Sequence, residues 1–267
     1  MPFDPDVSDF TRRDLSFLGR QKPVLTIGDR GPAVIVMHEA YGFTPEVARF
    51  CRWLRDAGLR VYAPILLGKP DASNPAEFGF WQILGLCISR EFTMLAANKT
   101  SPVTVWLRVL AKLAHEECGG AGVGAIGMCL TGGFALAMAV DDVMKAPVLS
   151  QPGMPARDKA ALDIDPAGLA RVKARVRDQG LVVRGYRFEG DPLSPPERFD
   201  TLRRELGDRF IGTELPDSCG NPQGLRAKGK KPHSVFTADL IDAKGERTRE
   251  AVDEVIAFFR EKLEIPA

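Results

Sequence analysis

The 267-residue sequence lacks an excess of charge of either sign, and it lacks any long uncharged apolar run. Lys and Arg total 36 and Asp and Glu total 35, so the formal net charge is +1. Proteins that bind nucleic acids or membrane surfaces usually carry a dominant basic field. A transmembrane helix needs about 20 mostly apolar residues. We therefore expect neither a nucleic-acid nor a membrane partner.

Cysteine is scarce and is not arranged in pairs. The five cysteines are odd in number and show no CxxC spacing, which favours free thiols in a reducing compartment. The acidic amino-terminal residues 1–6 lack the apolar segment of a signal peptide. These features predict a cytoplasmic protein.

Histidine is scarcer still. The sequence contains only His38, His115 and His233. The His38-Glu39 pair does not form a zinc motif, because HExxH requires a second histidine at position 42, where Gly42 stands. We expect no metal ion and no cofactor.

Short apolar segments alternate with amphipathic segments along the chain. The expected strands are 33–37, 59–66, 123–126, 146–150, 181–188 and 209–215. The segments between them have helical periodicity, and the last helix is expected near 252–263. This alternation predicts an α/β fold with a mostly parallel central sheet and helices on both faces. Residues 1–22 are charged and weakly patterned and are expected to form a surface arm.

No repeat or linker divides the sequence, so we expect a single domain over residues 1–267. Residues 74–100 are predicted to cap a pocket, with aromatic residues that line the pocket or form the core of the cap. Those aromatic residues are Phe78, Phe80, Trp81 and Phe92. Residues 216–232 are rich in Gly, Pro and Lys and are predicted to be an extended basic loop. This loop either steers anionic substrates or is an ordinary solvated segment.

The segment Gly127–Gly133 has the pattern of a nucleophile elbow. A small residue, any residue, a nucleophile and further small residues stand between the apolar run 123–126 and the helical run 134–140. Cys129 occupies the nucleophile position. The alternative is a small buried cysteine in a glycine-rich turn.

A nucleophilic thiol needs a base, and the base needs a carboxylate that orients it. Asp191 and His233 follow Cys129 in the order nucleophile, acid, histidine, which is the chain order of α/β-hydrolases. Taken singly, Asp191 is also explained as a turn residue and His233 as a surface-loop histidine.

The chain resembles the dienelactone hydrolase family. The matching segments are His38-Glu39-Ala40-Tyr41-Gly42, Gly127–Gly133, Gly190-Asp191 and Pro232-His233-Ser234. The resemblance implies an α/β-hydrolase fold in which Cys129 attacks a carbonyl carbon and forms an acyl-enzyme. It implies that His233 moves the protons and that Asp191 orients its ring.

The resemblance also implies an oxyanion hole made by the backbone N–H groups of Leu130 and Ala40. In the family, a glutamate at the position of Glu39 helps to generate the thiolate. The alternative for Glu39 is an ordinary carboxylate at a strand end. Tyr41 and Trp81 are further candidates for substrate binding.

Two positions depart from the family pattern. Thr237 stands where the family has an arginine that binds the lactone carboxylate, and Thr131 stands where the family usually has glycine. Arg90, in the expected cap, could supply a substitute positive charge. It is equally explained as a solvated arginine that pairs with Glu91 or Glu77.

The sequence thus predicts a cysteine hydrolase that cleaves a lactone or a small activated ester, including anionic ones, through an acyl-cysteine. Two alternatives remain open. One is a thioesterase or acyltransferase that uses the same triad. The other is a non-catalytic ligand-binding protein on a hydrolase scaffold. The sequence leaves the oligomeric state open.

Overall fold

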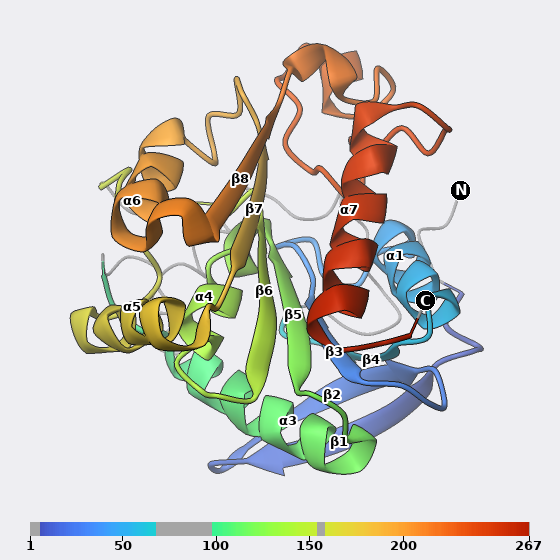
Figure 1. Cartoon of the computed structure of the whole chain (residues 1–267). Coiled ribbons are helices and arrows are strands. Elements are labelled where there is room, and N and C mark those ends of the chain that lie inside the picture. The colour runs from blue at the N-terminus through green and yellow to red at the C-terminus, as the bar shows by residue number, and fades with distance from the viewer. Residues whose placement is uncertain (1–5, 68–97, 154–157, 267) are drawn as a thin grey trace.

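The computed structural model describes residues 6–67, 98–153 and 158–266 (Figure 1). Eight strands form one sheet in the order β1-β2-β4-β3-β5-β6-β7-β8. They are β1 (Thr11–Phe17), β2 (Arg20–Ile27), β3 (Ala33–Met37), β4 (Arg60–Pro64), β5 (Val123–Met128), β6 (Met144–Ser150), β7 (Val183–Phe188) and β8 (Phe210–Leu215). Strands β3 to β8 run parallel to one another, whereas β2 pairs antiparallel with both of its neighbours, β1 and β4. The predicted α/β-hydrolase fold is confirmed.

Helices cover both faces of the sheet, as predicted. On one face lie α1 (Pro45–Asp56) and α7 (Arg247–Lys262); on the other lie α3 (Pro102–Cys118), α4 (Phe134–Met138), α5 (Pro166–Gln179) and α6 (Pro196–Leu206) (Figure 1). Successive residues of β3 point to opposite faces, so Val34 and Val36 pack with α1 and α7 whereas Ile35 packs with α3. Burial on both faces explains why the parallel strands read as continuous apolar runs.

The expected surface arm over residues 1–22 is wrong for residues 11–22, which belong to a β-hairpin of β1 and β2 at the edge of the sheet. Strand β1 pairs with β2 from Thr11 opposite Thr26 to Phe17 opposite Arg20. The two turn residues, Leu18 and Gly19, have φ values of 54° and 73°, as a two-residue hairpin turn requires. The charges of β1 suit an exposed edge strand, and they concealed its strand pattern in the sequence.

The parallel strands all point in the same direction, and the candidate site lies at their carboxyl ends. The loop His38–Gly42 follows β3, Cys129 follows β5, and Asp191 lies just beyond β7. Functional groups of open α/β sheets gather at the carboxyl ends of the strands. None of the helices in the described ranges combines the length and apolar character that a bilayer span requires.

Candidate active site

Cys129 lies on a strained turn between β5 and α4. Its φ is 55°, a conformation that residues other than glycine seldom adopt. The neighbouring glycines leave room for this turn. A Cβ on Gly127 would lie 2.0 Å from the carbonyl oxygen of Thr131, and one on Gly132 would lie 2.4 Å from the Cα of Pro152. Small residues are therefore required around Cys129 by backbone packing.

The hydroxyl of Thr131 joins the ends of β5 and β3. It accepts the N–H of Met128 at 3.0 Å and lies 3.0 Å from the carbonyl oxygen of Met37 and 3.1 Å from that of His38. The side chain is fully buried. A glycine at this position would leave the two strand ends without this link.

The structure brings His233 and Asp191 together. Nδ1 of His233 lies 2.6 Å from Oδ2 of Asp191, and Oδ1 of Asp191 accepts the N–H of Leu193 at 2.9 Å. Both side chains are buried. With Nδ1–H donated to the carboxylate, Nε2 of His233 is the ring atom left for proton transfer. Within the described part of the chain this buried nitrogen has no aligned hydrogen-bond partner.

The Cys129 thiol acts on the ring of His233. Burial lowers the pKa of His233, but a negative charge on Cys129 and the hydrogen bond to Asp191 outweigh it. Together they raise the pKa well above its usual value. The sulfur is close enough to influence the ring without being aligned for a hydrogen bond to Nε2. Asp191 and Cys129 thus both favour the protonated form of the His233 ring.

Glu39 is buried, and its side chain accepts hydrogen bonds from the segment that carries His233. Its carboxylate accepts the hydroxyls of Ser234 at 2.9 Å and Thr237 at 2.5 Å, and the side-chain amide of Gln151 at 3.0 Å. Burial raises the pKa of Glu39, and the charge of His233 and the two hydroxyls partly oppose this rise. Thr237, which replaces the arginine of the family pattern, is therefore a partner of Glu39.

Gln151, at the end of β6, is a site residue that the sequence analysis missed. It is fully buried, and its φ of 29° is strained for a residue other than glycine. Its Oε1 accepts the N–H of Val235 at 3.4 Å and the hydroxyl of Ser150, so its amide nitrogen must face Glu39. The signal available in the sequence was its position directly after a strand.

His38 has a structural environment. It is fully buried, and burial lowers its pKa to about 4. Nε2 accepts the N–H of Leu66 at 3.0 Å, so Nδ1 carries the proton and donates to the carbonyl of Glu39 at 2.7 Å. The neutral ring holds the loop that precedes Ala40.

The backbone N–H groups of Ala40 and Leu130 donate no hydrogen bond to another residue in the described ranges. Ala40 directly follows Glu39, and Leu130 directly follows Cys129. The ring of Tyr41 is partly buried, and burial together with the charges of Glu39 and Cys129 raises its pKa. Ala40, Tyr41 and Leu130, which were predicted to lie near Cys129, thus stand directly beyond the carboxyl ends of β3 and β5.

Asp239 is a second residue that the sequence analysis missed. Its fully buried carboxylate accepts the N–H groups of His233 at 2.8 Å, Ser234 at 3.0 Å and Leu225 at 2.9 Å. It therefore fixes the backbone on which the histidine stands.

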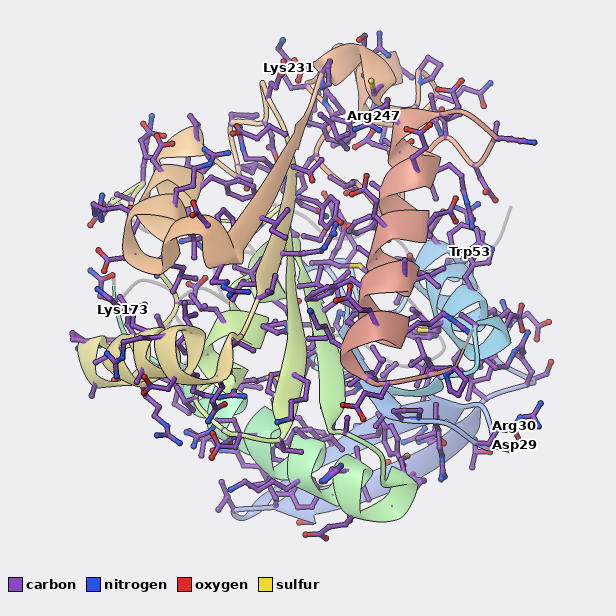
Figure 2. The ribbon with its side chains drawn as sticks, in the orientation of Figure 1. Asp29, Arg30, Trp53, Lys173, Lys231 and Arg247 are labelled. Carbon is purple, nitrogen blue, oxygen red and sulfur yellow. The ribbon has the colours of Figure 1, made fainter. Side chains whose placement is uncertain are left out.

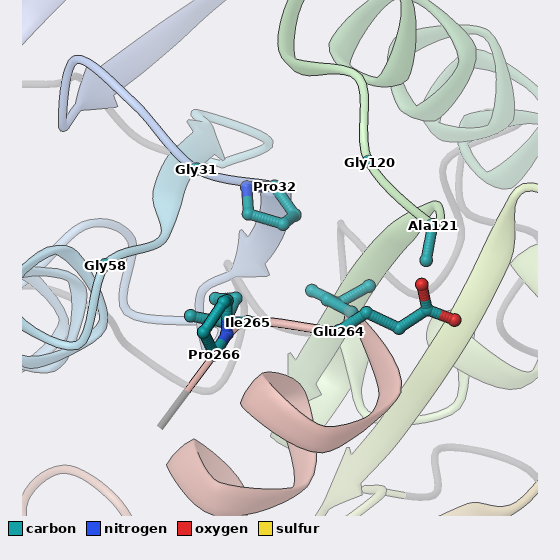
Figure 3. Close-up of a pocket in the computed structure, with 9 residues that line it drawn as sticks. Gly31, Pro32, Gly58, Gly120, Ala121, Glu264, Ile265 and Pro266 are labelled. Carbon is teal, nitrogen blue, oxygen red and sulfur yellow. The ribbon is translucent and has the colours of Figure 1, made fainter.

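A separate pocket lies at the opposite side of the sheet from the candidate site, at the amino ends of the strands (Figure 3). Gly31, Gly58 and Gly120, which line it, precede β3, β4 and β5, and its wall is completed by Leu263–Pro266. Glu264 is its one ionisable lining residue in the described part of the chain. None of the predicted site residues lines this pocket. In the described ranges no group of three or more His, Cys, Asp or Glu side chains is arranged to hold a metal ion.

Residues 22–165, more than half of the chain, match the family model described as the dienelactone hydrolase family. The chain belongs to the dienelactone hydrolase family. As a member, it is a hydrolase that acts on ester or lactone bonds. No curated protein matches it significantly.

Solved structures share the dienelactone hydrolase fold over nearly the whole chain. A candidate dienelactone hydrolase from Klebsiella pneumoniae is 16% identical, with a TM-score of 0.64, covering 96% of this chain and 98% of its own. The dienelactone hydrolase from Anabaena variabilis is 14% identical, with a TM-score of 0.61 and coverages of 96% and 99%. A dienelactone-hydrolase-like promiscuous phosphotriesterase from metagenomic libraries is 19% identical, with a TM-score of 0.60 and coverages of 93% and 98%.

Some predicted features of this dienelactone hydrolase family member lie outside the described residues. They include Arg90, Trp81 and the expected cap up to residue 97. The predicted basic loop is described and contains two short 3-10 turns, Asp217–Cys219 and Leu225–Lys228. Lys231, in this loop, lies at the same end of the molecule as Arg247 (Figure 2) and pairs with Asp217 at 2.6 Å. This positive charge is thus partly neutralised within the loop.

Proposed function

We propose that Cys129, His233 and Asp191 form a catalytic triad that hydrolyses a lactone or small activated ester through an acyl-cysteine. The observation that carries this proposal is the state of His233. Nδ1 of His233 lies 2.6 Å from Oδ2 of Asp191, whereas Nε2 is buried without an aligned partner in the described part of the chain. A negative charge on Cys129 also raises the pKa of the ring. This is the arrangement that a base for the thiol requires.

The reaction begins when the Cys129 thiolate attacks the carbonyl carbon and forms the S–C bond. The negative charge moves to the carbonyl oxygen, which the N–H groups of Leu130 and Ala40 stabilise. Collapse breaks the C–O bond of the ester, and the protonated His233 gives its proton to the departing alkoxide. Water then loses a proton to His233 and attacks the thioester, which releases the acid and regenerates the thiolate.

The substrate class follows from the leaving group. A thiolate displaces an aryloxide, an enolate or a strained lactone oxygen readily, whereas an amide nitrogen is a poorer leaving group. We propose small lactones and activated esters as substrates. Tyr41 is proposed to contact the acyl group, because it directly follows Ala40, the proposed oxyanion donor, in the loop after β3.

Purified wild-type protein and the variants Cys129→Ala and Cys129→Ser test the proposal on a panel of aryl esters and lactones. Cys219→Ala is the matched control, since Cys219 is also a partly exposed free cysteine. We expect turnover to be lost in Cys129→Ala and kept in the control Cys219→Ala. We also expect an acyl adduct on the Cys129 peptide of quenched wild-type enzyme. Unchanged turnover in Cys129→Ala would sink the proposal. Product analysis with added alcohol or thiol acceptors separates hydrolysis from acyl transfer.

A further inference from the structure

The Glu39 carboxylate connects two segments that the proposed reaction must hold in register. On one side, residue Glu39 directly precedes Ala40, whose backbone N–H is the proposed oxyanion donor. On the other side it binds Ser234 and Thr237, which lie one and four residues after His233. One buried carboxylate therefore sets the position of the proposed oxyanion hole relative to the proposed base.

We propose that Thr237 and Gln151 are positioning residues that keep the Glu39 carboxylate ionised and fixed between Ala40 and His233. The inference rests on the proposed function, because it assigns these residues to that same site. Neither residue is placed in contact with the substrate. Both act through Glu39.

The chemistry of the donors supports an ionised Glu39. A side-chain amide nitrogen can only donate, and the contacts of Gln151 direct this nitrogen at Oε1 of Glu39. The hydroxyl of Thr237 approaches the same oxygen at 2.5 Å. Oε1 therefore accepts two hydrogen bonds, and donors to a carboxylate oxygen favour its ionised form.

The backbone of Gln151 indicates that this arrangement is built. A buried residue at a φ of 29° persists only when its surroundings impose that conformation. The N–H of Gln151 donates to the carbonyl of Tyr186 at 2.6 Å, which holds the strained backbone while the side chain reaches Glu39. Strain of this kind is common where side-chain placement matters for function.

The charged and titratable groups that face Glu39 define the pH dependence. The charge of His233 favours the ionised carboxylate, Asp239 opposes it, and Tyr41 lies within its influence. Because a donor to the ionised form lowers a carboxyl pKa, loss of the Thr237 hydroxyl raises the pKa of Glu39. The acid limb of kcat/KM for ester cleavage must then move to higher pH.

Thr237→Val removes the hydroxyl with little change of shape, and Thr237→Ser restores it. Thr104→Val is the matched control, because Thr104 is a buried threonine whose hydroxyl has no partner within the described residues. We expect Thr237→Val to lower kcat about tenfold with little change in KM. We expect its acid limb to rise by about 1 pH unit, as for the loss of one hydrogen bond to an ionised group. Thr237→Ser and Thr104→Val should follow the wild type.

A second readout does not depend on ester turnover. The rate of Cys129 alkylation by iodoacetamide is measured against pH from the Cys129 peptide, and its inflection should move upward in Thr237→Val. Superimposable profiles of Thr237→Val and wild type, or a Thr237→Ser protein as impaired as Thr237→Val, overturn the inference. Retained turnover in Cys129→Ala overturns the proposed function instead. The alkylation profile then decides the inference: a shifted Thr237→Val curve supports it and coincident curves overturn it.

Discussion

The carboxylate of Asp239 accepts the backbone N–H of His233 at 2.8 Å. The same carboxylate accepts the N–H groups of Ser234 and Leu225. One buried side chain therefore anchors both the histidine segment and the preceding loop. The position of the imidazole is set through its main chain as well as through its ring partner Asp191.

Replacement of Asp239 by Ala should destabilise the protein and impair turnover. It leaves buried backbone donors without an acceptor, and we expect the free energy of unfolding to fall by about 3 kcal/mol. Urea denaturation and ester turnover measure the two effects. Asp239→Asn keeps one carbonyl oxygen and should lose less stability; equal stability of Asp239→Ala and wild type would contradict this role.

Asp191→Asn tests the orientation of His233. An asparagine at this position favours the wrong ring tautomer, and the expected loss in kcat is about 10³–10⁴-fold, as in serine triads. Asp217→Asn is the control, because Asp217 binds the N–H of the neighbouring Gly190 at 2.8 Å without reaching His233. A loss confined to a few-fold in Asp191→Asn would remove Asp191 from the triad.

His38 should make stability fall in acid. Its pKa is about 4 in the folded protein because of burial, against about 6.5 in the unfolded chain. The unfolded chain therefore binds the proton first as pH falls below about 6.5, and stability declines until pH 4. The expected loss is about 3 kcal/mol. The difference in unfolding free energy between wild type and His38→Gln, followed from pH 7 to pH 4, measures it; parallel curves would contradict the assignment.

Gly127→Ala should disrupt the turn of Cys129. The added Cβ would meet the carbonyl oxygen of Thr131 at 2.0 Å, a backbone contact that cannot move aside. We expect loss of turnover and a stability loss of about 3 kcal/mol or more. Gly180→Ala is the control, since its Cβ would meet nothing within 4 Å and only its φ of 66° opposes alanine. That variant should lose about 1 kcal/mol and remain active.

The buried pair of Arg198 and Asp163 should show strong coupling. Arg198 lies 2.7 Å from Oδ2 of Asp163 and also contacts the carbonyl of Gly153, whose N–H binds the carbonyl of Cys129. Arg198→Met leaves a largely buried carboxylate unpaired and should cost about 3–5 kcal/mol. The double variant with Asp163→Asn should recover part of this loss in a double-mutant cycle. Additive losses would show that the pair is not coupled.

Much of the fold could be predicted because burial leaves a simple pattern. The expected strand 33–37 is β3 itself, and the expected strand 209–215 differs from β8 by one residue. The edge hairpin was missed because β1 is exposed on much of its surface and bears charges. An edge strand derives its structure from pairing with β2, which leaves little mark on its own sequence.

Cys129, Asp191 and His233 could be singled out because each stands in a short linear pattern. Gln151 and Asp239 could not, since their role consists of hydrogen bonds to residues distant in the chain. Gln151 binds Glu39, which lies 112 positions away. No local pattern encodes such a contact. The roles of all these residues in catalysis remain predictions.

The link made by Thr131 has a consequence for protein engineering. Its hydroxyl ties the turn of Cys129 to the strand end that leads to Ala40. The two loops therefore form one module, and neither can be redesigned or transplanted independently. A graft of this elbow into another scaffold must carry the end of β3 with it, or the new protein will present its thiol beside a misplaced loop.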